Sequence, residues 1–145
     1  MSEFVEIKTA DLVGTALDWA TFCAVYPDMQ PIIKITESTT KLLFKNAAKP
    51  VTFPRSVRLA RMGLYGIEID WYPSSDWECG GPLIEADELT IEPSAWDWKG
   101  ACALWRAQEE GANVYFEHTN LLVAAMRAVV HAKLGDTVSV PKELV

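Results

Sequence analysis

Residues 119–135 read TNLLVAAMRAVVHAKLG and hold the clearest helical pattern of this 145-residue chain. Apolar side chains recur there at the spacing of one helix face, namely at Leu122, Ala125, Met126 and Val129. That period predicts a helix with its apolar face toward a core. The last turn carries basic groups and is followed by Gly135, which suits the negative end of a helix and its termination.

A second helix is expected near the start of the chain. Thr9 can act as its N-cap, and the apolar spacing continues to about Val25, before Pro27 ends it. Strands are expected around these helices at residues 4–8, 32–35, 41–44, 66–71, from 83 onward, 101–107, 113–117 and 136–140. The strand at 66–71 alternates apolar and acidic residues, which predicts one buried face. Residues 72–82 are expected to form a polar loop.

These elements predict an α+β fold, with two main helices packed on an antiparallel sheet. The composition is 50% hydrophobic and 23% charged, without repeats or linkers, so we expect a single domain over residues 1–145. No apolar run has the length of a membrane span, and residues 1–6 lack the pattern of a secretory leader. The expectation is therefore a cytoplasmic protein without a membrane partner.

The charge of the chain is unevenly distributed. Its net charge is −7, yet residues 27–66 hold seven basic and two acidic side chains, and residues 67–98 hold nine acidic and no basic ones. One interpretation is that solvated faces of opposite charge meet across strands or subunits. The other is a polarised molecule whose basic edge attracts an anion. The negative total disfavours duplex nucleic acid as a partner, because it opposes binding to phosphates.

The sequence offers little for catalysis. Three separated cysteines and two histidines form no metal-binding spacing, and nucleotide-binding or hydrolase motifs are missing, so we expect neither a metal nor a cofactor. Cys79 with His118 or His131 as base is one conceivable nucleophile, although a structural thiol is the simpler interpretation. Enzyme activity is thus left open, with a non-enzymatic role favoured.

Trp77 is the most unusual residue, because its large indole lies in a stretch of small and polar side chains. Binding groups often lie in such loops. A ring flanked by hydroxyls and a carboxylate suits a planar, hydroxylated ligand. We therefore expect a ligand site over this segment, formed by Tyr72, Ser74, Ser75, Asp76, Trp77, Gly80 and Gly81.

Three further places are assigned to the same site. Asp18 and Trp19 lie in the first helix, where a mid-helix aspartate needs a partner; an ordinary salt bridge or an exposed position is the alternative. Thr119 and Asn120 precede the last helix, where free amides suit a phosphate, although helix capping explains them equally well. Arg127, on the last helix, completes the set.

Three blocks carry a family resemblance. They read EIKTADLVGTALDWA at 6–20, YPSSDWECGGPLIE at 72–85, and LVAAMR at 122–127 with KLGDTVSVP at 133–141. Together they resemble the NinX-type proteins of tailed phages and prophages. The chain differs from that family at 118–121, where a Gly-Pro-Thr-Pro-like segment is usual, and in an insertion-like basic stretch at 36–62. The resemblance implies a phage accessory protein acting in a bacterial host cell, and it supplies no reaction.

The leading hypothesis is non-enzymatic binding of a small polar, nucleotide-like ligand, which would serve counter-defence by sequestering a host signalling nucleotide. A protein-interaction module that inhibits or redirects a host factor is the alternative. A hydrolase or transferase with Asp76 or Asp18 as base is the third. A homo-oligomer is expected under each. The binding hypothesis expects Trp77 and its neighbours to line one open hollow together with Asp18 and Trp19.

Overall fold

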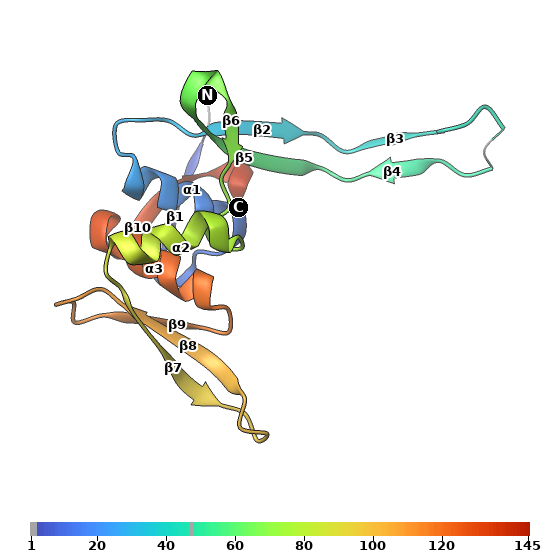
Figure 1. Ribbon diagram of the computed structural model, residues 1–145. Coiled ribbons are helices and arrows are strands. Elements are labelled where there is room, and N and C mark those ends of the chain that lie inside the picture. Colours follow the sequence, from blue (N-terminus) through green and yellow to red (C-terminus); the bar gives the residue numbers. More distant parts are fainter. Residues whose placement is uncertain (1–2, 47) are drawn as a thin grey trace.

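The computed structural model describes residues 3–46 and 48–145. Over these residues the chain forms three α-helices, which pack together in a central body (Figure 1). They are α1 (Gly14–Val25), α2 (Trp77–Ala86) and α3 (Leu121–Leu134). Three short 3₁₀ helices are also present in the described residues, at Thr9–Asp11, Leu64–Gly66 and Lys142–Leu144.

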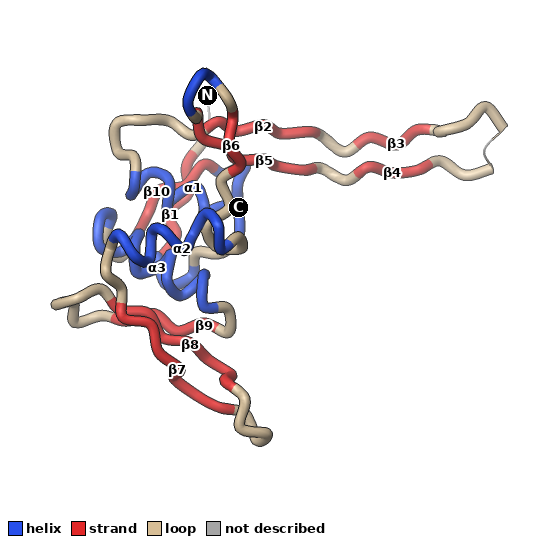
Figure 2. The backbone as a smooth tube through the Cα atoms, viewed as in Figure 1, coloured by secondary structure: helices blue, strands red, loops and turns tan. Residues whose placement is uncertain are grey.

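All strand pairs are antiparallel. Strand β1 (Phe4–Lys8) pairs with β10 (Thr137–Pro141), and β7 (Thr90–Trp96), β8 (Cys102–Gln108) and β9 (Tyr115–His118) form a second sheet in that order. A third sheet has the order β2 (Ile32–Thr36), β5 (Ser56–Met62), β6 (Glu68–Asp70). Strands β3 (Thr39–Lys41) and β4 (Val51–Phe53) extend it outward as a separate ribbon (Figure 2). The predicted α+β class is confirmed.

Helix α3 lies at the centre of the core, since every residue from Leu122 to Val130 is buried. It packs against α1 and α2 and against the sheet of β7, β8 and β9. A smaller core cluster of Phe22, Leu59 and Trp71 joins α1 to β5 and to the segment before α2. This second cluster positions the segment that carries Trp77.

Both ends of the last helix, α3, lie where the sequence predicts them. Asn120 is its N-cap, and the Asn120 side chain accepts hydrogen bonds from the amides of Leu122 and Val123. Gly135 follows with φ of +86°, a conformation that favours glycine, and its amide donates to the carbonyl oxygen of His131. The first strand, the 102–108 and 115–118 hairpin and the final strand are also confirmed.

The predicted start of the first helix is wrong. Helix α1 begins at Gly14, and Val13 is its N-cap residue without a capping side chain. Thr9 instead donates its hydroxyl to the carbonyl oxygen of Gly135 at 2.6 Å, and its amide donates to the carbonyl oxygen of Asp136. The threonine therefore joins the end of β1 to the end of α3 rather than capping α1.

The predicted loop at 72–82 and the strand from Leu83 are also wrong, because α2 covers residues 77–86. Asp76 is the N-cap, and its side chain accepts from the amide of Glu78 at 3.1 Å. The Gly80-Gly81-Pro82 run indicates a turn on local propensity. Tertiary packing at Gly80 decides for a helix, and the next strand starts only at Thr90.

Two strand predictions need correction. The strand expected at 41–44 is shifted to Thr39–Lys41, and residues 42–44 lie outside it. The strand expected at 66–71 is present as β6 only over residues 68–70, and Ile67 and Ile69 keep 61% and 39% of their surface exposed. Of the expected buried face, Trp71 is buried and the two isoleucines are not. None of the helices in the described part of the chain has the length and apolar character needed to cross a bilayer.

Candidate functional site

Asp18 holds the segment before α2 against α1. Its Oδ1 accepts a hydrogen bond from the backbone amide of Ser74 at 2.8 Å, and both residues are buried. Burial raises the pKa of the Asp18 carboxyl to about 6, and hydrogen bonds from Ser74 counteract part of that rise. The partner that a mid-helix aspartate required is thus a backbone amide in the predicted ligand segment.

A second bond reinforces the first. The indole Nε1 of Trp71 donates to the backbone carbonyl oxygen of Asp18 at 2.8 Å. Its ring packs edge-on against Phe22, with centroids 5.6 Å apart. Trp71 therefore has a structural role through its ring. Tyr72, the next residue, also has one, because its carbonyl oxygen accepts hydrogen bonds from the amides of Ser75 and Asp76.

Gly80 is present because its neighbours come too close for a side chain. A Cβ at Gly80 would lie 2.3 Å from the carbonyl oxygen of Pro73 and 3.0 Å from Leu122. At Gly81, a Cβ would meet only the Trp77 ring, at an ordinary 3.7 Å. Gly80 therefore lets α2 approach the Pro73 turn and α3, and this steric role accounts for it without a ligand.

The first hollow brings four of the predicted residues together, and we call it the Trp77 hollow. Ser75 and Trp77 come from the start of α2, and Thr119 and Asn120 come from the start of α3. Its volume is about 350 Å³, and its full lining is Ser75, Trp77, Trp105, Thr119, Asn120, Leu121 and Leu122. All of these side chains are uncharged. Trp77 remains 59% exposed at its edge.

The backbone amides at the start of α3 were expected to be free, but several of them already donate hydrogen bonds. Asn120 uses its Oδ1 to accept from Leu122 and Val123, and its own amide donates to Nδ1 of His118 at 2.9 Å. Capping thus explains the placement of Asn120. Its side-chain amide nitrogen and the exposed Thr119 hydroxyl remain as polar groups of the hollow.

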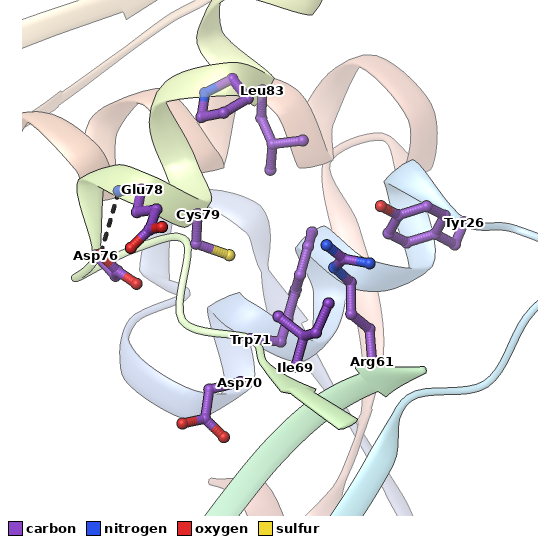
Figure 3. A pocket seen from close by; sticks show the side chains of 10 residues that line it. Tyr26, Arg61, Ile69, Asp70, Trp71, Asp76, Glu78, Cys79 and Leu83 are labelled. Carbon is purple, nitrogen blue, oxygen red and sulfur yellow. Dashed lines mark hydrogen bonds between the residues drawn. The ribbon is translucent and has the colours of Figure 1, made fainter. Parts of the chain in front are cut away.

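A second hollow, of about 590 Å³, lies between the β5–β6 edge and α2, and we call it the acidic hollow. In Figure 3, Asp76 and Glu78 stand together at the start of α2, with the Cys79 sulfur beside them and Arg61 next to Trp71. Its lining comprises Tyr26, Arg61, Ile69, Asp70, Trp71, Asp76, Glu78, Cys79, Pro82 and Leu83. Three carboxylates and one guanidinium thus lie in this lining, and the Asp70 carboxylate is already paired with Arg58 at 2.6 Å.

The Cys79 thiol in this hollow is a weak nucleophile. Burial raises its pKa to about 11, and the nearby carboxylates of Asp18 and Asp76 add to the rise. A thiol with that pKa is almost entirely protonated at neutral pH. The raised pKa of Cys79 therefore argues against the nucleophilic role considered for it from the sequence.

Trp19 lies elsewhere. It lines a third hollow, of about 410 Å³, with Phe4, Ile33 and Ile35. The single hollow expected to join Trp77 with Asp18 and Trp19 is therefore absent from the described residues: Asp18 is buried on Ser74, Asp76 lines the acidic hollow, and Trp19 faces a different surface. The reason is that neighbouring helix positions point about 100° apart, so Asp18 and Trp19 cannot share one direction.

Arg127 also lies apart from the Trp77 hollow. It is buried, and its Nε donates to the backbone carbonyl oxygen of Leu12 at 2.9 Å. Burial lowers the pKa of its guanidinium, and the nearby Asp11 opposes this. The bond joins α3 to the chain just before α1, which gives Arg127 a structural role.

Sequence reasoning missed Trp105 in the Trp77 hollow and Arg61 in the acidic hollow. Trp105 was expected in a hairpin strand, which β8 confirms, but no local pattern says which face of that strand meets α3. Among residues 3–46 and 48–145, no three His, Cys, Asp or Glu side chains gather as a metal site would require.

The fold and the hollows define a small α+β protein with open polar sites. The family model described as Bacteriophage P22, NinX matches residues 8–133. The chain therefore belongs to the NinX family, which confirms the resemblance. No curated protein matches it.

Proposed function

We propose that this NinX-family protein is a non-enzymatic binding protein, and that its Trp77 hollow takes a small polar, nucleotide-like ligand. The observation that carries the proposal is the meeting of Ser75, Trp77, Thr119 and Asn120 in one hollow with a second indole, Trp105. The volume of about 350 Å³ lies within the range of small-molecule sites.

The aromatic groups favour a planar ligand. Trp77 is 59% exposed, and Trp105 in the same lining is half-buried. An exposed indole held at the start of a helix offers a flat face for stacking, which contributes about 1–3 kcal/mol per nucleic-acid base. The hydroxyls of Ser75 and Thr119 and the amide of Asn120 supply hydrogen bonds to ring or sugar groups.

Charge distinguishes this hollow from the acidic one. In the acidic hollow Asp70 is paired with Arg58, but Asp76 and Glu78 still outnumber Arg61, so a phosphate there would meet net repulsion. The lining of the Trp77 hollow is uncharged and includes the first residues of α3, whose dipole favours an anion although the amides of Asn120, Leu122 and Val123 are already bonded. A ligand with both a ring and a phosphate therefore fits the Trp77 hollow better.

Asp18 and Cys79, two groups considered for catalysis, lie outside the Trp77 hollow, which favours binding without chemistry. The Asp18 carboxylate is bound to a backbone amide, and the Cys79 thiol, with its pKa of about 11, is protonated at neutral pH. For a phage or prophage accessory protein in a bacterial host, sequestering a host signalling nucleotide is a purpose that needs only affinity.

Tryptophan fluorescence titrated with mononucleotides and cyclic dinucleotides tests the proposal. We expect a saturable change with at least one compound, lost in Trp77→Ala and kept in Trp98→Phe, which alters an indole far along the chain. Chromatography of the bound compound should recover it unchanged. A flat response across the panel contradicts binding, and recovered product contradicts the non-enzymatic role.

A second candidate function rests on a different observation. Trp96 and Trp98 at the end of the β7–β8 hairpin are 60% and 90% exposed. Exposed tryptophans are common anchors of protein interfaces, which suits a module that inhibits or redirects a host factor. A purified host partner should then bind the wild type and lose at least tenfold in affinity with Trp98→Ala, while Trp77→Ala tells whether the Trp77 hollow takes part. Equal affinity of Trp98→Ala and wild type contradicts this function.

A further inference from the structure

The basic stretch at 36–62 forms most of a long projecting ribbon, which we call the arm (β2 and β3 on one strand, β4 and β5 on the other). Figure 1 shows it extending clear of the helices. The register places Ile33 opposite Leu59 and Ile35 opposite Val57 in the inner half. In the outer half, Thr39 lies opposite Phe53 and Lys41 opposite Val51.

Alternation makes this arm amphipathic. Side chains opposite each other share a face, and neighbours along a strand take opposite faces. Two residues separate the inner from the outer half on each strand, an even number that keeps the faces aligned. One face therefore carries Ile33, Ile35, Val51, Phe53, Val57 and Leu59, with Thr39 and Lys41 beside Phe53 and Val51 in its outer half, and the other carries Lys34, Thr36, Thr40, Thr52, Ser56 and Arg58.

The inner end of the apolar face opens onto a groove. Ile33 and Ile35 line the 410 Å³ hollow, which we call the root groove, together with Phe4 and Trp19. Arg55 points to the same side, since its Nη2 donates to the carbonyl oxygen of Glu143, another lining residue. The groove and the apolar face of the arm are thus one continuous surface.

The described chain covers the outer half of this surface only in part, through the Lys41 Nζ, which lies 5.4 Å from the centroid of the Phe53 ring. Val51 and Phe53 are each 40% exposed, and the turn beyond them exposes Leu42, Leu43 and Phe44 by 55%, 51% and 73%. The six steps from Ile35 to Lys41 span about 20 Å at roughly 3.3 Å per residue, and the turn carries the surface further. A two-stranded ribbon is marginal alone in water, so an apolar face of this length needs a partner surface.

The distribution of charge indicates which surface can cover the apolar face of the arm. Residues 38–55 hold Lys41, Lys45, Lys49 and Arg55 and no acidic residue. Around the root groove lie the carboxylates of Glu143, which lines it, and of Glu37, close to Arg55. The Glu37 side chain is 76% exposed and its Oε1 lies 3.8 Å from Arg55 Nε. The arm tip is therefore basic and apolar through Lys41, Lys45 and Lys49, and the root is apolar with two carboxylates against the one guanidinium of Arg55.

We propose that the arm docks on a second copy of this chain, with the tip of each arm in the root groove of the other. The two apolar faces then lie against each other in opposite directions around a two-fold axis. Such a pairing is closed, because each copy gives one tip and receives one. It sets Lys45 and Lys49 near Glu37 and Glu143 of the second copy. Packing the arms in the same direction would place lysines against lysines, which like-charge repulsion opposes.

Sedimentation of the full chain tests the proposal with matched neighbours on β4. The wild type should sediment as a dimer. Phe53→Asp places a charge on the apolar face and should weaken dimerisation at least a hundredfold. Thr52→Asp places the same charge on the other face and should leave the dimer intact. Circular dichroism checks that both variants fold, and Phe44→Asp, in the turn outside the ladder, repeats the test should Phe53→Asp not fold.

A charge exchange tests the orientation. Lys49→Glu should weaken the dimer about tenfold, and adding Glu143→Lys in the same chain should restore most of the loss, because the exchanged charges attract again. A wild type that stays monomeric at every concentration, or equal sedimentation of Phe53→Asp, Phe44→Asp and Thr52→Asp, overturns the proposal. Dimerisation without rescue in the double variant overturns the tip-to-root orientation.

Discussion

The Asp18 carboxylate accepts a 2.8 Å hydrogen bond from the amide of Ser74, 56 residues further along the chain. This bond, with that of Trp71 to the Asp18 carbonyl oxygen, joins α1 to the segment that leads into α2. These two buried hydrogen bonds therefore fix the backbone that leads to Trp77 against α1. Ser75 and Trp77 follow on this fixed backbone, and their side chains are exposed.

The first prediction concerns Asp18 and pH. Burial raises its pKa from 3.8 to about 6, so the folded protein holds this proton more tightly than the unfolded chain. The contribution to stability is full below about pH 4 and is lost as the pH rises through about 6. Two pKa units correspond to about 3 kcal/mol. Asp18→Asn, which can still accept from Ser74, should gain stability relative to wild type by up to that amount between pH 4 and pH 7.

Urea unfolding at a series of pH values measures this difference. Asp28→Asn is the matched control, because Asp28 is exposed, and it should follow the wild type within about 0.5 kcal/mol. Parallel stability curves for wild type and Asp18→Asn across pH 4–7 would contradict the buried carboxylate.

The second prediction compares two adjacent glycines. Gly80→Ala should destabilise the protein by about 1–3 kcal/mol, because its Cβ would lie 2.3 Å from the Pro73 carbonyl oxygen. Gly81→Ala has room, with its nearest neighbour at 3.7 Å, and should gain up to about 1 kcal/mol from helix propensity. Thermal unfolding of the two variants shows the sign of each, and an equally tolerated Gly80→Ala would refute the close approach of α2.

The third prediction separates a structural tryptophan from an exposed one. Trp71→Phe removes the Nε1 donor to Asp18 and leaves its carbonyl oxygen buried without that bond, so we expect a loss of about 1–3 kcal/mol. Trp98→Phe changes a side chain that is 90% exposed and should stay within about 0.5 kcal/mol of wild type. Denaturant unfolding followed by far-ultraviolet circular dichroism provides both values, and equal losses would refute the assignment.

The fourth prediction concerns the reactivity of Cys79. A pKa of about 11, against an ordinary 9.0, leaves about a hundredfold less thiolate at neutral pH than an ordinary cysteine has. Alkylation by iodoacetamide, followed by peptide mass spectrometry, should therefore be slow at pH 7 and still accelerate above pH 9. A rate that levels off below pH 8 would indicate an activated thiol and revive a catalytic interpretation.

The last helix and the strands around it could be predicted because local signals and tertiary packing agree there. Asn120, the apolar period and Gly135 each indicate the same element. At α2 they disagree: Gly80 and Pro82 favour a turn on propensity, and contact of Gly80 with Pro73 and Leu122 decides otherwise. Thr9 similarly has the chemistry of a helix cap, but a partner 126 residues away takes its hydroxyl.

The candidate site was predictable in part for the same reason. An indole in a polar segment is visible in the sequence, and Ser75, Trp77, Thr119 and Asn120 do meet in one hollow. The direction of a side chain from a helix is set by packing, so the assignment of Asp18 and Trp19 to that hollow was wrong. The contribution of Trp105 depends on how β8 lies on α3, which no local pattern carries.

The most direct test is the indole region of the ¹H–¹⁵N spectrum while mononucleotides and cyclic dinucleotides are added one at a time. The account predicts that at least one compound shifts the Nε1 signals of Trp77 and Trp105 saturably, while that of Trp98 stays in place. Signals that remain fixed with every compound, or shifts confined to tryptophans outside the Trp77 hollow, would contradict it.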